Sequence, residues 1–121
     1  LFNLSKQAIN PGKNFGPYGL AKSSTLFLMK QYALEHGEEG ITSNAVNADR
    51  VNTGIFKGGL LQERAKARGL TVDQYLRDGN LLKREVTVHD VAQAFVALTK
   101  SRVTTAAVIT VDGGNIAASM R

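Results

Sequence analysis

The sequence predicts an α/β fold built on a parallel β-sheet. Three short apolar runs, at residues 1–5, 41–47 and 106–111, have the composition of buried strands, and helical patterns that begin near residues 17 and 87 separate them. Strands that alternate with helices in this way are typical of parallel βαβ construction. We therefore expect about three strands with flanking helices, in one domain over residues 1–121.

A polar loop joins the first strand to the first helix. Residues 6–16 contain an Asn-Pro-Gly turn signal, and Pro17 suits the first turn of a helix. This helix is expected to run to about His36 and to end at Gly37. Its apolar residues cover far more than one stripe, so we expect burial on two sides, by the core and by a partner subunit.

The segment 54–86 differs in character from the sequence around it. It contains two short helix candidates, 60–68 and 72–77, each followed by a glycine. Thr71 and Gln74 form a capping-box pattern for the second candidate. We interpret this segment as a helical excursion that acts as a lid.

The last helix is predicted to begin at a second capping-box pattern, Thr87 with Asp90. The third strand, 106–111, follows it and leads into an Asp-Gly-Gly turn. The apolar residues that we expect this helix to bury are Val91, Ala92, Ala94, Phe95, Ala97 and Leu98.

The composition is that of an ordinary globular protein, with 43% apolar and 21% charged residues. No apolar run approaches the ~20 residues of a membrane span, and no basic-then-apolar leader is present. The net charge of +5 is dispersed among acidic residues, as in 62–68, without interleaved aromatic residues. A solvated helix face explains this charge better than nucleic-acid binding, although attraction of anionic substrates is compatible with it.

Metal and thiolate chemistry find no support in the sequence. Cysteine is absent, which excludes disulfides and thiolate nucleophiles. The two histidines, His36 and His89, lie far apart and have no metal-ligand spacing. We therefore predict no metal site.

The most informative residues are Tyr18, Lys22 and Ser5. Tyr18 and Lys22 are four residues apart and share one helix face, so the ammonium can lie beside the phenol. A nearby cation favours the ionised phenol, whose pKa is otherwise about 10, and this makes Tyr18 a candidate general acid or base. Ser5 could hold a substrate oxygen against the phenol. For the Tyr-Lys pair alone, a surface Tyr beside a solvated Lys is the simpler interpretation.

Gly12, Gly16 and Gly19 have spacings that resemble a dinucleotide-binding loop. Such a loop turns directly from strand to helix, so that backbone amides meet the pyrophosphate. Here a long loop precedes the glycines, and Pro17 removes an amide donor. We therefore do not interpret these glycines as a phosphate site.

Several motifs accompany Ser5 and the Tyr18–Lys22 pair in a fixed order: Asn-Ala-Val-Asn-Ala-Asp-Arg-Val-Asn-Thr at 44–53, His-Asp-Val-Ala at 89–92 and Val-Asp-Gly-Gly at 111–114. Together they resemble the C-terminal half of a short-chain dehydrogenase/reductase, over essentially the whole chain. The resemblance implies a partial domain, the C-terminal part of a Rossmann-like doubly wound parallel sheet. Its N-terminal nucleotide-binding half is expected to lie upstream.

Other segments are similar to the dehydrogenase part of bifunctional rhamnulose-1-phosphate aldolase/short-chain dehydrogenase proteins: 5–8, 10–16, 47–50 and 112–118. This resemblance implies that a sugar of the rhamnose type supplies the substrate.

The family resemblance also implies roles for individual residues. Tyr18 would exchange the proton with the substrate oxygen, and Ser5 would orient that oxygen. Lys22 would lower the pKa of Tyr18 and hold the nicotinamide ribose. Val51 and Thr53 would meet the nicotinamide carboxamide. The cofactor would be NAD or NADP, with NAD favoured, and hydride transfer belongs to the cofactor.

The sequence departs from the family where Ala48-Asp49 replaces the usual Pro-Gly. Asp49 and Arg50 could form an internal ion pair or could contact the substrate, and both interpretations stay open. Lys6, Gln7 and Asn14, in the loop after Ser5, are further candidates for substrate binding; a solvated loop is the alternative.

The leading prediction is a cytoplasmic NAD(P)-dependent oxidoreductase that acts on a small alcohol, aldehyde or hydroxy compound. The alternative is an inactive dimerisation module that binds no cofactor by itself, and an anion-binding regulatory domain is a third, weaker interpretation. Because the first strand would lack a neighbour and leave an open edge, we expect a homo-oligomer or association with the N-terminal half. We expect neither nucleic-acid nor membrane partners.

Overall fold

The computed structural model describes residues 1–54 and 58–118. Its centre is a three-stranded parallel sheet in the order β1-β2-β3, formed by β1 (Phe2–Leu4), β2 (Ala45–Ala48) and β3 (Val108–Val111). Both neighbouring pairs run in parallel, as the alternation of strands and helices predicted. The α/β fold class is therefore confirmed.

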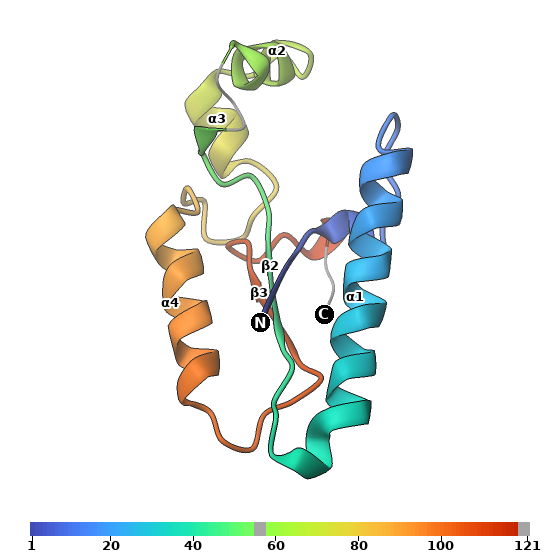
Figure 1. Cartoon of the computed structure of the whole chain (residues 1–121). Coiled ribbons are helices and arrows are strands. Elements are labelled where there is room, and N and C mark those ends of the chain that lie inside the picture. Colours follow the sequence, from blue (N-terminus) through green and yellow to red (C-terminus); the bar gives the residue numbers. More distant parts are fainter. Residues whose placement is uncertain (55–57, 119–121) are drawn as a thin grey trace.

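Two long helices cover the sheet. Helices α1 (Gly16–His36) and α4 (Val88–Lys100) lie on opposite sides of the strands (Figure 1). Helices α2 (Leu60–Lys66) and α3 (Val72–Arg77) lie beyond the end of the sheet at which β2 finishes. Ligands of open α/β sheets bind outside the carboxyl ends of the strands, which is where these two short helices lie.

Three short 3-10 helices are also present in the part of the chain that the structure describes. They are η1 (Lys6–Ala8), η2 (Gly37–Glu39) and η4 (Ile116–Ala118). The first follows β1 directly, and the last follows the loop after β3.

The hydrophobic core is divided into two clusters. In the sheet cluster, Leu4 of β1 and Ala45 of β2 pack with Met29 of α1, which is completely buried. The second cluster joins α2 and α3 through four buried residues, which are Leu61, Ala65, Tyr75 and Leu76. Full burial of a large apolar side chain contributes roughly 1.5–3 kcal/mol, so each cluster stabilises its own part of the chain.

Both capping boxes occur as the sequence predicted. The Thr71 hydroxyl accepts a hydrogen bond from the Gln74 amide, and the Gln74 side chain accepts one from the Thr71 amide. Thr87 and Asp90 make the equivalent contacts at the start of α4. The hydrogen bonds that the Asp90 carboxylate accepts from Thr87, chiefly from its hydroxyl, lower the pKa of Asp90.

The second and third strands begin later than predicted. Residues 41–44 precede β2 because the Asn44 side chain bonds instead to the chain before β3, donating to the Thr104 carbonyl at 2.7 Å and accepting from the Ala107 amide at 3.0 Å. At β3, the left-handed φ of 57° at Ala106 interrupts the extended backbone, so the strand starts only at Val108. The first lid helix also ends early, at Lys66.

The prediction for the face that α4 buries was partly wrong. Leu98 is buried and Val91, Ala94 and Phe95 are half-buried, whereas Ala92 and Ala97 are exposed. The four covered positions follow the i, i+3, i+4, i+7 spacing of one helix face. The two alanines lie off that face, and their apolar character alone made them appear buried.

Helix α1 contacts the sheet with one side only. Met29 and Ala33 are buried, while several large apolar residues on the rest of its surface are exposed: Leu20, Phe27, Leu28, Tyr32 and Leu34. The helix is therefore apolar on both sides, as expected, but this single chain covers only one of them. None of the helices in the described ranges is long and apolar enough to cross a membrane.

Candidate active site

A cavity of about 600 Å³ lies at the carboxyl ends of β1 and β2. Its walls come from the end of β1, the loop and first turn of α1, the chain after β2, and helices α2 and α4. The lid segment thus forms one wall and the sheet another. Several residues that the sequence singled out line this space.

Two of the three predicted catalytic residues line the cavity. Ser5 immediately follows β1, and its hydroxyl accepts a hydrogen bond from the Gln7 amide at 3.3 Å, which caps η1. Tyr18 lies in the first turn of α1 and is 41% exposed. The ring of Phe15 meets the Tyr18 ring edge-on, with centroids 5.9 Å apart, a packing that orients aromatic side chains.

Lys22 lies one helical turn after Tyr18. Its ammonium donates a 2.9 Å hydrogen bond to the carbonyl of Asn3 in β1 and lies 5.7 Å from the centroid of the Tyr18 ring. The sheet therefore anchors the cation beside the aromatic residue, as the i, i+4 spacing predicted. Lys22 is not among the described residues that line the cavity.

Val51 and Thr53 also line the cavity, from the chain that follows β2. Thr53 is exposed and Val51 is half-buried. With Tyr18 and Ser5 they place a hydroxyl, a phenol and a backbone segment around one space, a donor set that fits the nicotinamide end of NAD(P). The fit concerns that end only, because these groups provide no cradle for the diphosphate.

Two of the three glycines with dinucleotide-like spacing, Gly12 and Gly19, pack against Gln7 of η1, whereas a Cβ at Gly16 would meet nothing within 4 Å. A Cβ added at Gly12 would meet the Gln7 side chain at 2.8 Å, and one at Gly19 would meet the Gln7 carbonyl at 3.3 Å. Neither glycine has the left-handed φ found elsewhere in the chain. Close packing between loop and helix therefore accounts for these two positions.

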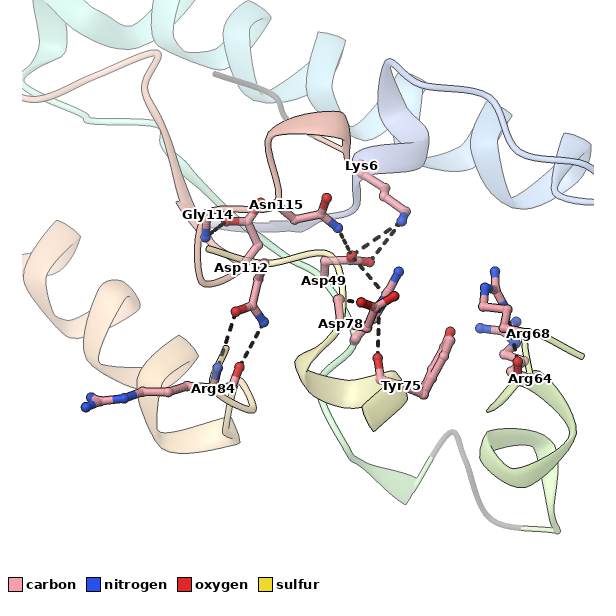
Figure 2. A network of polar contacts seen from close by, with 12 residues as sticks. Lys6, Asp49, Arg64, Arg68, Tyr75, Asp78, Arg84, Asp112, Gly114 and Asn115 are labelled. Carbon is pink, nitrogen blue, oxygen red and sulfur yellow. Dashed lines mark hydrogen bonds and ion pairs between the residues drawn. The ribbon is translucent and has the colours of Figure 1, made fainter. Parts of the chain in front are cut away.

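Asp49 is the centre of a polar network at the end of β2 (Figure 2). Its carboxylate lies 3.2 Å from the Lys6 ammonium and 3.7 Å from Arg50 Nε, and it accepts a 2.8 Å hydrogen bond from Asn115. The internal contact between Asp49 and Arg50 is thus present. Asp49 is outside the cavity lining, whereas Lys6 and Arg50 belong to it together with Gln7 and Asn14.

Arg50 ties the lid to the end of β2. Its Nη1 donates hydrogen bonds to the carbonyls of Tyr75 and Asp78, and its guanidinium lies 4.8 Å from the Tyr75 ring centroid. The backbone of Arg50 has a left-handed φ of 53°. The Arg50 side chain therefore links the chain that follows β2 to the C-terminal end of α3.

Sequence reasoning missed one charged residue of the site. Arg64 of α2 lines the cavity and is half-buried, with its guanidinium 5.4 Å from the Phe15 ring centroid. The sequence interpretation placed it on a solvated helix face. The one feature of the sequence that pointed to a covered position for Arg64 was the apolar Ala65 next to it in the helix, a residue that the structure buries. No group of three or more His, Cys, Asp or Glu residues that could hold a metal occurs among the described residues.

Comparisons with known proteins show which family the chain belongs to. A family model described as enoyl-(acyl carrier protein) reductase matches residues 3–115. The uncharacterized oxidoreductase YuxG of Bacillus subtilis (strain 168) is 37% identical over 128 aligned residues, which cover 100% of this chain and 19% of the relative. The chain therefore spans about a fifth of the length of that relative.

Solved structures share the fold. A short chain dehydrogenase family protein from Francisella tularensis subsp. tularensis SCHU S4 superimposes with a TM-score of 0.80 at 27% identity, over 96% of this chain and 50% of that one. A small-chain dehydrogenase in complex with NADPH gives a TM-score of 0.78 at 20% identity, over 95% of this chain and 49% of that one. The family model spans nearly the whole chain, and on that ground the chain belongs to the short-chain dehydrogenase/reductase family, of whose Rossmann-like fold it forms a part.

Proposed function

We propose that this chain supplies the proton-transfer part of an NAD(P)-dependent oxidoreductase that interconverts a small alcohol and its carbonyl compound. The observation that carries the proposal is the meeting of Ser5, Tyr18, Val51 and Thr53 around one cavity, with the Lys22 ammonium 5.7 Å from the Tyr18 ring. Family membership and the oxidoreductase name of the Bacillus relative support it. The resemblance to bifunctional aldolase/dehydrogenases favours a substrate from the breakdown of a rhamnose-type sugar.

Each residue has a chemical task in this proposal. In the oxidising direction, the Tyr18 phenolate accepts the proton of the substrate hydroxyl, which the Ser5 hydroxyl positions by a hydrogen bond. The Lys22 ammonium, 5.7 Å from the Tyr18 ring centroid, holds the nicotinamide ribose, as the family resemblance implies. When bound, the nicotinamide supplies the hydride acceptor or donor. Val51 and Thr53 orient the nicotinamide carboxamide.

A cofactor titration tests the proposal. We expect the full-length protein to enhance the fluorescence of NADH or NADPH saturably, with a micromolar dissociation constant, and Thr53→Val to weaken this binding because the variant lacks the hydroxyl. Thr25→Val is the matched control, since the Thr25 hydroxyl donates to the Ala21 carbonyl within α1. Both cofactors are titrated because the resemblance to short-chain dehydrogenases favours NAD, whereas two solved structures with the same fold, ElxO and the small-chain dehydrogenase, contain NADP and NADPH. Absence of binding to either would contradict the proposal.

The proposal includes self-association through the exposed side of α1. Phe27 and Leu34 are 69% and 79% exposed, and exposed apolar side chains that gather on one helix favour a protein partner. β1 is also an edge strand of the sheet, and open edges favour pairing. The alternative function, a dimerisation module without activity, rests on the same helix.

Light scattering checks the oligomeric state. We expect a mass of at least two chains at micromolar concentration, and we expect Phe27→Ser with Leu34→Ser to shift the mass toward one chain. Val103→Ser is the control, since Val103 is 97% exposed but lies outside α1. A monodisperse monomer for the unmodified protein would overturn self-association and would leave the proposed chemistry standing.

A further inference from the structure

The cavity at the strand ends is lined by three cationic side chains. Lys6 follows β1, Arg50 follows β2, and Arg64 comes from α2. The described residues that line the cavity include no Asp or Glu. A wall with one sign of charge raises the local concentration of oppositely charged ligands, so the lining favours anions.

One carboxylate partly balances this charge from outside the cavity. The Asp49 carboxylate is shared by two of the cations, because it lies 3.2 Å from the Lys6 ammonium and 3.7 Å from Arg50 Nε. The Arg50 guanidinium also contacts the backbone carbonyls of Tyr75 and Asp78 and the Tyr75 ring, and none of these groups carries a charge. The Lys6 and Arg50 cations thus share the Asp49 carboxylate.

Arg64 is placed to bind an anionic group near the reacting atoms. Its guanidinium lies 5.4 Å from the Phe15 ring centroid, and the Phe15 ring lies 5.9 Å from that of Tyr18. An arginine stacked on an aromatic ring presents its planar fork of N–H groups in a fixed orientation, which suits two-point contact with a carboxylate or phosphate. Arg64 and Tyr18 thus both contact Phe15 and both line the cavity, so that one bound compound can meet both side chains.

We propose that the substrate carries an anionic group, a carboxylate or a phosphate, which Arg64 binds while Tyr18 exchanges the proton of the hydroxyl group. The substrate class is therefore a small hydroxy acid or a phosphorylated hydroxy compound. This inference rests on the proposed function and adds to it the chemistry of the substrate. Arg64 acts through binding, and the proton transfer remains with Tyr18.

A matched set of three-carbon compounds tests the inference in the full-length protein. Glycerol is neutral, glycerate carries a carboxylate, and glycerol 3-phosphate carries a phosphate. We expect kcat/KM to be higher for at least one of the two anions than for glycerol, and the anion that is preferred identifies the group. We expect Arg64→Met to lower kcat/KM for the preferred anion by about ten- to a hundredfold, because the variant loses hydrogen bonds to a charged group. The loss should appear mainly as a higher KM. The same substitution should change kcat/KM for glycerol by less than about twofold.

Arg68→Met is the control for loss of a stacked arginine. Its guanidinium lies 5.1 Å from the Tyr75 ring centroid, but Arg68 is exposed and is not among the cavity residues. We expect this variant to leave the preference for the anion unchanged. Arg64→Lys should recover part of the binding, since it keeps the charge and loses the fork. Circular dichroism of each variant shows whether the lid helices are retained.

Binding without turnover separates this inference from the proposed function. Glycerate and inorganic phosphate are titrated into the protein without cofactor, and binding is followed by calorimetry for the unmodified protein and for Arg64→Met. Binding of an anion that requires Arg64, in a protein that binds neither NADH nor NADPH, supports the anion site and contradicts the oxidoreductase. Oxidation of glycerol in preference to both anions, or equal effects of Arg64→Met on all three, overturns the anion site and leaves the oxidoreductase standing.

Discussion

Replacing Tyr18 with Phe is expected to lower kcat of the full-length protein by about 100-fold or more, while cofactor binding changes by less than about threefold. The substitution removes only the phenolic oxygen, the atom that exchanges the proton, and general acid–base catalysis contributes about 10²- to 10⁴-fold. The edge-on contact with Phe15 involves the ring, which the variant keeps. Steady-state kinetics and the fluorescence titration measure the two effects separately.

Tyr32 offers a closely matched control on the same helix. Like Tyr18 it is 41% exposed, and its ring contacts those of Phe2 and His36, outside the cavity. Tyr32→Phe should therefore leave kcat within about twofold of the unmodified protein. If Tyr18→Phe retains more than about a tenth of the activity, another group carries the proton.

Gly113→Ala is expected to destabilise the protein by about 2–5 kcal/mol. Gly113 follows β3 with a φ of 66°, where a side chain costs about 1–2 kcal/mol. An added Cβ would also lie 2.7 Å from Cγ of the buried Asn80, and such overpacking typically costs about 1–3 kcal/mol. Asn80 has little freedom to move, because its amide bonds to both the carbonyl and the amide of Arg84.

Gly69 separates the two causes. It has the same φ of 66°, but a Cβ there would meet nothing within 4 Å. Gly69→Ala should therefore show only the backbone cost, about 1–2 kcal/mol, and urea unfolding followed by circular dichroism gives both values. Equal destabilisation by the two substitutions would show that the contact with Asn80 imposes no constraint.

Features fixed by neighbouring residues could be predicted from the sequence. The Thr71 and Thr87 capping boxes depend on contacts three residues apart, and both helices begin where these patterns placed them. The start of α1 followed from Pro17 in the same way. The i, i+4 spacing likewise placed Lys22 beside Tyr18, because a helix fixes that geometry locally.

Features that depend on distant contacts could not be predicted in this way. The late start of β2 results from bonds between Asn44 and residues about sixty positions further along the chain. Arg64 faces the cavity only because the fold brings α2 beside Phe15, and the charge pattern around it resembles an ordinary solvated helix. The ion pair of Asp49 with Arg50 was one of two interpretations that the sequence left open. The contacts of Asp49 with Lys6 and Asn115 join three separate segments of the chain.

The separate core of α2 and α3 has a consequence for how the protein can change its specificity. The cluster around Leu61 and Tyr75 shares no residue with the cluster around Leu4 and Met29. Substitutions of Leu61 and Ala65, which contact neither Arg50 nor Gly113 in this arrangement, can therefore accumulate without disturbing the cluster beneath Tyr18 and Lys22. The reaction and the choice of substrate are then open to separate selection, and exchange of the 58–80 segment between relatives is a practical route to new substrates for the same chemistry.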